Sequence, residues 1–339
     1  MIVTSVTVRV PAKVNLQLAV GPLRPDGYHG LVTVFHAVSL FDEVTVVPAE
    51  ADSVTVSGEG ADLVPEDGDN LALRAVRTLR QAIAKRDIAV ASGNAARASD
   101  TGGAAGAAGK RAAAVGGAPK AGGVAVSIEK RIPVAGGMAG GSADAAAALV
   151  ACNQLWGAGL TQEELCAVAG DVGSDVAFAV LGGTAVGRGR GEQLTPVPSA
   201  MPATYHWVVA FAEGHLSTPT VFRTLDKQRQ DQEAAEPELS AELMEALSTG
   251  DPARLGAALS NDLQEPALTL FPALRKTLDA GLEAGALGAL VSGSGPTCFF
   301  LASDDRHSSD LAVSLSGAGV CRAVASAAGP AAGACVIER

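Results

Sequence analysis

The stretch that decides the fold runs from Pro133 to Leu149 and reads Pro133-Val134-Ala135-Gly136-Gly137-Met138-Ala139-Gly140-Gly141-Ser142-Ala143-Asp144-Ala145-Ala146-Ala147-Ala148-Leu149. A strand-like stretch, Val124–Ile128, precedes it, and its alanine-rich second half predicts a helix. We expect Ser142 to cap this helix and Asp144 to lie in its first turn. A strand, a glycine loop and a helix N-terminus in this order can bind phosphate, because backbone amides and the positive helix end converge on the anion. Residues 134–144 are therefore the candidate binding site for a nucleotide phosphate.

Short glycine motifs also occur where no ligand binds. Gly136 and Gly141 have the spacing of a P-loop, but Ser142 stands where that motif has lysine, and the dinucleotide-binding fingerprint does not match either. The alternative is a flexible turn in a chain that is rich in alanine and glycine. The helix that follows favours the phosphate loop. If the loop binds phosphate, the neutralising cation must come from elsewhere in the chain.

Length and charge narrow the class of protein. The chain has 339 residues and a formal net charge of −11, which predicts two domains or one large one and disfavours nucleic acid and membrane surfaces as partners. It has no apolar run of membrane-spanning length and no signal-peptide layout at its start. Five cysteines without close pairs fit neither a disulfide framework nor a zinc site, and Cys152 and Cys298 are expected in the core. We expect a cytoplasmic protein without an obligate protein partner.

The chain alternates strand and helix signals. Four strand-like stretches open it, and a helix is expected after Asn70; the stretches are Val3–Val10, Val14–Val20, Leu31–Ser39 and Glu43–Pro48. Residues 93–123 are dominated by alanine and glycine, and we expect a disordered surface insertion there, because such a segment buries too little apolar area to offset its ordering entropy. Strand signals at Trp207–Phe211 indicate the start of a second domain.

Three segments together resemble the GHMP kinases, the superfamily of galactokinase, homoserine kinase and mevalonate kinase. They are Pro11–Leu16, the glycine loop and Leu290–Pro296. The resemblance covers nearly the whole chain apart from the insertion. It implies an α/β (α+β) fold in two parts: an N-terminal ATP-binding domain of ribosomal-protein-S5-like type at 1–196 and a C-terminal ferredoxin-like domain at 197–339, with the active site between them. Met138 and Ala139 stand where the superfamily usually has leucine and glycine, and we expect the loop to accommodate both.

A finer resemblance concerns the substrate. Pro25-Asp26-Gly27-Tyr28-His29, followed by Thr33-Val34-Phe35, is similar to superfamily members that act on CDP-methylerythritol in the non-mevalonate route to isoprenoids. The implied reaction is ATP-dependent phosphorylation of the tertiary C2 hydroxyl. Two alternatives remain: a GHMP kinase acting on homoserine or mevalonate, and a nucleotide-binding regulator without catalysis. A base-stacking tyrosine argues against the first, and intact candidate catalytic residues argue against the second.

The resemblance also assigns catalytic roles. Asp175, in the Gly173–Asp175 turn, is the implied general base, although on sequence alone it also fits a helix cap. Lys13 is the implied partner that keeps this carboxylate ionised and stabilises the developing alkoxide; the alternative is an edge lysine extending to solvent. Asn15, two residues on, shares a strand face with Lys13 and is expected to orient the substrate.

The remaining roles concern the ligands. Tyr28 is the implied stacking platform for cytosine, and His29 the hydrogen-bonding partner of the base edge; the alternative is plain surface exposure after a turn. Phe222 either closes the other face of the base or belongs to the core, and Thr218 is assigned to the substrate. The expected cofactor is ATP with Mg²⁺, with Ser142 as the oxygen nearest the metal.

Overall fold

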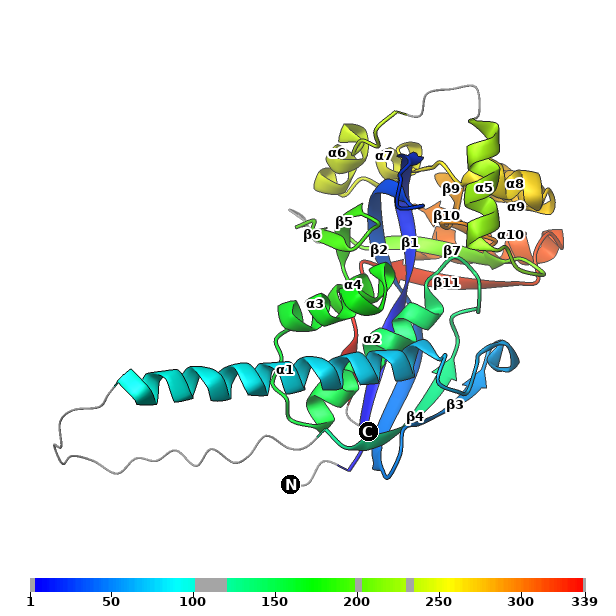
Figure 1. The fold of residues 1–339 in the computed structure, drawn as a ribbon. Coiled ribbons are helices and arrows are strands. Elements are labelled where there is room, and N and C mark those ends of the chain that lie inside the picture. Colours follow the sequence, from blue (N-terminus) through cyan, green and yellow to red (C-terminus); the bar gives the residue numbers. More distant parts are fainter. Residues whose placement is uncertain (1–3, 101–120, 199–202, 230–234, 338–339) are drawn as a thin grey trace.

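Two β-sheets and the helices around them make up the structure, a computed structural model that describes residues 4–100, 121–198, 203–229 and 235–337 (Figure 1). The first sheet contains β1 (Val6–Leu23), β2 (His29–Ala49), β3 (Ser53–Gly58), β4 (Gly123–Lys130), β5 (Thr184–Gly189), β6 (Gln193–Pro196), β8 (Ser260–Asn261) and β12 (Cys335–Ile337). The second is antiparallel, in the order β11 (Ala323–Gly329), β7 (Tyr205–Phe211), β10 (Cys298–Ala302) and β9 (Gly288–Val291).

The helices lie on both sheets. They are α1 (Leu71–Asp100), α2 (Gly140–Leu155), α3 (Gln162–Val172), α4 (Ser174–Leu181), α5 (Thr218–Gln228), α6 (Ala241–Thr249), α7 (Pro252–Ala257), α8 (Gln264–Leu270), α9 (Ala273–Glu283) and α10 (Asp305–Ala318), with a 3₁₀ turn at Ala61–Leu63. Within the described ranges, no helix is both long and apolar enough to cross a bilayer.

Two long strands form the centre of the first sheet. The sequence predicts four short strands, but β1 and β2 each run unbroken through two of the expected stretches and pair antiparallel along their length. Register shifts at Pro11/Ala12 and Asn15/Gln17 absorb the irregularities that look like strand ends in the sequence. Proline lacks the backbone N–H that a ladder needs, and bulges of this kind re-aim neighbouring side chains. One of the shifts lies directly beside Asn15.

Helix α2 is largely buried. It lies between α1 and the paired strands β1 and β2 (Figure 1). Its alanines, Ala143, Ala145–Ala148 and Ala151, are fully or almost fully buried, and Leu149 and Cys152 continue the same core. Small side chains let neighbouring elements approach the helix closely, so the alanine run that looks like low complexity is core packing. The expected burial of Cys152 and Cys298 is confirmed, and the cysteines are free.

The expected insertion begins later than the sequence suggests. Residues 93–100 continue α1, so the prediction of disorder is wrong for them. Alanine-rich sequence has high helix propensity, and extending an existing helix avoids the cost of nucleation. Residues 101–120 lie outside the described residues, and β4 starts at Gly123. The boundary between residues 196 and 197 stays a prediction. Strand β12, near the C-terminal end of the chain, pairs with β1, so the first sheet contains residues from both sides of that boundary.

Candidate active site

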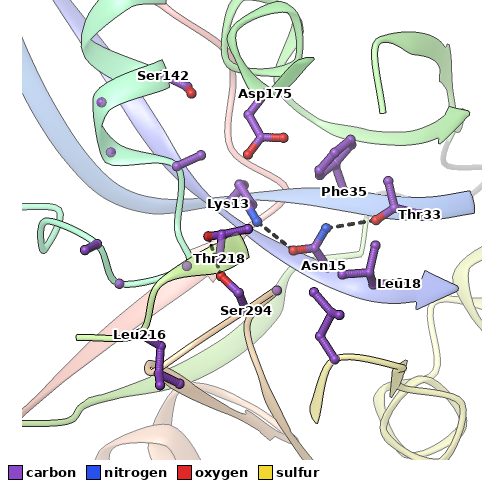
Figure 2. A pocket seen from close by; sticks show the side chains of 18 of the residues that line it. Lys13, Asn15, Leu18, Thr33, Phe35, Ser142, Asp175, Leu216, Thr218 and Ser294 are labelled. Carbon is purple, nitrogen blue, oxygen red and sulfur yellow. Dashed lines mark hydrogen bonds between the residues drawn. The ribbon is translucent and has the colours of Figure 1, made fainter. Parts of the chain in front are cut away.

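A cavity of about 480 Å³ collects the candidate catalytic residues. Its walls come from β1, the glycine loop, the first turn of α4, the start of α5 and the turn between β9 and β10 (Figure 2). Of the expected residues it is lined by Lys13, Asn15, Ala135, Gly136, Gly137, Ala139, Gly140, Gly141, Ser142, Asp175, Thr218 and Phe222. Segments far apart in the sequence therefore meet at one site, as the resemblance implies.

Lys13 extends into this cavity from β1 and is buried. Its Nζ donates to Asn15 Oδ1 at 2.6 Å, and Asn15 Nδ2 donates to Thr33 Oγ1 at 2.8 Å (Figure 2). Burial lowers the pKa of Lys13, while the negative charge of Asp175 acts in the opposite direction. The alternative of an edge lysine extending to solvent is wrong, and Asn15 shares the face as expected.

Asp175 lies in the first turn of α4, directly after Gly173 ends the preceding helix α3. It caps no helix through its side chain, since the N-cap position of α4 belongs to Gly173. The carboxylate instead lines the same cavity as the Lys13 ammonium (Figure 2). A carboxylate and a buried ammonium facing one cavity can accept a proton and stabilise a developing negative charge there.

The glycine loop ends in a helix that starts earlier than predicted. Helix α2 begins at Gly140 with Ala139 as N-cap, so the assignment of Ser142 as cap is wrong. Ala139 adopts a left-handed conformation, φ 60°, and the first intrahelical bond runs from Ala143 N to Ala139 O. The amides of Gly140, Gly141 and Ser142 precede that bond and are left for another acceptor. This open first turn lines the cavity and can bind phosphate oxygens.

Four expected loop residues lie elsewhere. The side chains of Met138 and Ala143 are buried in the core. Val134 and Asp144 line a second cavity of about 260 Å³ on another side of the loop, which shares Ala135 and Gly141 with the first. Asp144 lies beyond the first turn of α2, where its Oδ2 accepts from Lys130 Nζ at 2.7 Å, and burial raises its pKa to about 8. The structure thus places Asp144 in a buried ion cluster behind the loop.

The third motif of the resemblance, Leu290–Pro296, contacts the glycine loop. Ser292 Oγ donates to the carbonyl of Gly137 at 3.0 Å. Gly137 has φ 74°, and a Cβ there would lie 2.2 Å from the carbonyl oxygen of Ser292, so only glycine fits. Gly293 lies close to β1, since a Cβ on it would be 3.4 Å from Lys13 Nζ. The second and third motifs therefore pack directly on each other beside Lys13.

A neighbouring cavity of about 560 Å³ contains Tyr28 and His29. His29 Nδ1 is 2.9 Å from the carbonyl oxygen of Gly21, its Nε2 is 3.3 Å from Asp226 Oδ1, and its ring stacks on Phe222 with centroids 5.3 Å apart. Tyr28 is 53% exposed. The two cavities share Thr218 and Phe222, among other residues, so one elongated ligand can reach from the tyrosine to Lys13.

The sequence reasoning missed two charged residues of this region. The guanidinium of Arg190 lies 4.6 Å from the centroid of the Tyr28 ring and lines both cavities. It sits between Gly189 and Gly191, both with positive φ, and an arginine in a glycine turn after a strand is the signal that could have indicated it. Asp226 follows Phe222 by one helical turn on α5, and the i, i+4 spacing could have placed both on one face.

The expected magnesium ion would have few protein ligands among the described residues. Among the described residues, no group of three or more histidine, cysteine, aspartate and glutamate side chains is arranged to hold a metal ion. Magnesium does not need such a group, because it keeps several waters and binds one or two protein oxygens together with substrate phosphates. Ser142 and Asp175 both offer oxygen atoms to the cavity that the glycine loop lines. These residues fit a metal carried by the nucleotide.

Comparisons with known proteins identify the family of this chain. Residues 70–183 match the family model of the GHMP kinases N terminal domain, and residues 243–320 match that of the GHMP kinases C terminal domain. The 4-diphosphocytidyl-2-C-methyl-D-erythritol kinase of Thermobifida fusca is 52% identical over 98% of this chain and 99% of its own length. The enzyme of the same name from Mycolicibacterium gilvum is 51% identical over 98% and 93%.

Solved structures extend the likeness to the fold. A crystal structure of 4-(cytidine 5'-diphospho)-2C-methyl-D-erythritol kinase, 31% identical, superposes with a TM-score of 0.69 over 95% of this chain and 98% of that one. A homoserine kinase from Cytophaga hutchinsonii, 18% identical over 99% and 98%, has a TM-score of 0.67 and shares the fold alone. The expected α/β fold is confirmed. The chain belongs to the GHMP kinases and, within them, to the family of the 4-diphosphocytidyl-2-C-methyl-D-erythritol kinases.

Proposed function

We propose that this protein transfers the γ-phosphoryl group of ATP to the C2 hydroxyl of CDP-methylerythritol, a step of isoprenoid precursor synthesis. The observation that carries the proposal is the joined pair of cavities, in which the Lys13–Asp175 site opens towards Tyr28 and His29. An elongated substrate with a base at one end and a sugar alcohol at the other fits that layout. The free cysteines are consistent with a reducing compartment such as the cytoplasm.

The chemistry at the Lys13 end follows from three side chains. Asn15 orients the sugar alcohol, and Asp175 accepts the proton of the C2 hydroxyl as its oxygen attacks the γ-phosphorus. The new O–P bond forms while the bond to the bridging oxygen of ADP breaks. Lys13 stabilises the negative charge that develops on the attacking oxygen, and its low exposure to water strengthens that interaction.

The glycine loop would hold the phosphates of ATP. Their oxygens accept from the open amides at the start of α2, and the cavity of about 260 Å³ on the other side of the loop leaves room for the nucleoside. Ser142 would approach the magnesium ion, which neutralises phosphate charge when bound. Positive charge that the loop lacks thus comes from Lys13 and the metal.

The cavity of about 560 Å³ around Tyr28 and His29 supports recognition of a cytidine diphosphate. Tyr28 stacks on the base, and the Asp226 carboxylate beside His29 can accept from the exocyclic amino group of cytosine. Arg190 lines both cavities, between the base and the reacting hydroxyl, where the diphosphate of an elongated substrate would lie. A guanidinium suits this position because it can bind two phosphate oxygens at once.

Replacing Tyr28 by alanine should raise the KM for CDP-methylerythritol roughly 5- to 150-fold, since stacking contributes about 1–3 kcal/mol per base. The KM for ATP should hardly change. Steady-state kinetics with each substrate varied in turn measures both constants. Tyr28→Phe is the matched control, because it keeps the stacking ring and should stay close to wild type. Equal losses for both substrates would mean that Tyr28 supports the fold rather than the base.

Replacing Gly141 by valine should weaken ATP binding about tenfold while the protein stays folded. A Cβ at this position would be 3.4 Å from Leu71 Cδ1, an ordinary contact, and valine is a better helix former than glycine. The branched side chain would nevertheless project where the open helix turn meets phosphate. Calorimetric titration with a non-hydrolysable ATP analogue measures the change. Unchanged affinity would remove this turn from the nucleotide site.

Substrate profiling tests the proposed function as a whole. Purified protein is incubated with ATP, Mg²⁺ and each of CDP-methylerythritol, homoserine and mevalonate, and ADP formation is followed. We expect turnover only with CDP-methylerythritol, because the other two alcohols have no base for Tyr28. Turnover of another alcohol at a comparable rate would reassign the substrate. Absence of ATP turnover with every alcohol would favour a nucleotide-binding regulator.

A further inference from the structure

A buried cluster of three charged side chains lies behind the glycine loop. Lys130 Nζ, at the end of β4, donates to Asp42 Oδ2 of β2 at 2.5 Å and to Asp144 Oδ2 of α2 at 2.7 Å. The side chains of Lys130, Asp42 and Asp144 are 1%, 0% and 3% exposed. We call these three residues the loop clamp. It connects three separate elements through one ammonium group.

The clamp ties both ends of the glycine loop. Asp42 Oδ1 accepts from the backbone amides of Arg131 and Ile132, at 2.6 and 2.8 Å, where the chain leaves β4. Asp144 fixes the other end, one turn into α2. A Cβ on Gly140, the first residue of that helix, would lie only 3.1 Å from Lys130 Nζ. Lys130 therefore lies directly against the first residue of the helix.

The loop between these ends is held in an unfavourable conformation. Ala135 and Ala139 have φ values of 54° and 60°, in the left-handed region that residues with a Cβ avoid. Each costs roughly 1–2 kcal/mol and persists only where surrounding structure determines it. The Lys13 amide and the Ser292 hydroxyl bond to the carbonyls of Met138 and Gly137 in the middle of the loop. The clamp, by contrast, contacts both ends of the glycine loop.

Asp144 is the clamp member that charge pairing does not require. Lys130 and Asp42 already form a balanced buried pair, and a second carboxylate adds a desolvation cost. No described residue gives Asp144 Oδ1 a hydrogen bond, although the atom is buried. A second, incompletely satisfied carboxyl is a poor source of stability. Its contact with Lys130 does, however, connect the start of α2 to the end of β4.

We propose that the Lys130–Asp144 contact is a positioning device, which holds the open amides of α2 in the place where ATP phosphates bind. This inference rests on the proposed nucleotide role of the loop. Lys130 and Asp144 border the cavity of about 260 Å³, but their side chains are only 1% and 3% exposed. None of the three side chains touches the reacting atoms, so we infer that Lys130 and Asp144 act through the backbone of Gly140 and its neighbours. Disrupting the clamp should therefore weaken the binding of ATP and leave the binding of the cytidine substrate unchanged.

Replacing Asp144 by alanine tests the device, because the Lys130–Asp42 pair stays balanced. We expect the KM for ATP to rise about tenfold, the factor that corresponds to losing one hydrogen bond to a charged group. The KM for CDP-methylerythritol and kcat at saturating ATP should stay within about twofold of wild type. Asp144→Asn should restore the KM for ATP, since its amide oxygen can still accept from Lys130.

Two further variants separate positioning from stability. Leu149→Ala removes buried side-chain volume from the same helix, so it should lower the melting temperature without changing the KM for ATP. Gly140→Ala presses on Lys130 without opening a cavity, and it should raise the KM for ATP even if Asp144→Ala does not fold. The inference is overturned if Asp144→Ala and Gly140→Ala bind ATP like wild type, or if Leu149→Ala raises the KM for ATP equally. Wild-type protein that does not turn over CDP-methylerythritol would instead contradict the proposed function.

Discussion

Replacing Asp175 by asparagine is expected to lower turnover roughly 10²–10⁴-fold while both substrates still bind, the range typical of a general base. Asparagine keeps the shape of the side chain and most of its hydrogen bonding, but it cannot accept the hydroxyl proton. Asp175 lies in the first turn of α4, and asparagine is nearly isosteric, so the change should leave the site geometry intact. The loss should appear in kcat, with little change in either KM.

Single-turnover kinetics gives the decisive measurement, because it isolates the chemical step from product release. Asp171→Asn is a matched control: this exposed aspartate lies on the preceding helix α3, outside both cavities. It should behave like wild type. An Asp175→Asn protein that retains near wild-type rates, with chemistry shown to limit turnover, would rule out Asp175 as the base.

Replacing Lys13 by methionine should lower turnover by a similar amount, roughly 10²–10³-fold, as for loss of one electrostatic contact to a developing anion. Methionine fills a comparable volume but removes the charge that the transition state needs. It also removes the donor to Asn15 Oδ1, so the orientation of Asn15 loses one of its two hydrogen-bond partners. Lys276→Met changes an exposed lysine and serves as the control for the altered net charge.

The double variant Lys13→Met/Asp175→Asn tests whether the two side chains act as one unit. Because Asp175 influences the charge state of Lys13, we expect the double variant to be little slower than the slower single variant. Turnover rates of the wild type, the two single variants and the double variant, measured under the same conditions, complete this double-mutant cycle. Fully additive losses would mean that the two groups contribute independently, and the paired mechanism would have to be abandoned.

The sequence by itself determined the local pieces of this protein. Alternation along a strand places Lys13 and Asn15 on one face, whatever the strand packs against, because side chains repeat every two residues. The glycine run before an alanine-rich helix predicts a phosphate loop from the backbone freedom of glycine and the polarity of a helix end. Thr161 and Glu164 have the spacing of a capping box, and this box is present at the start of α3. The family was recognisable from the same motifs.

Only the tertiary structure decided which of these segments contact one another at the site. Met138, Ala143 and Asp144 lie within the phosphate-loop motif, yet their side chains face the core and the loop clamp instead of the main cavity. Arg190 and Asp226 carry no local signal as strong as a glycine loop, and they join the site because folding brings a turn and a helix beside Tyr28. Local patterns follow from backbone geometry and propensity within a few residues. Contacts such as Lys130 with Asp42 depend on how strands and helices pack over the whole chain, and no short stretch of sequence encodes that packing.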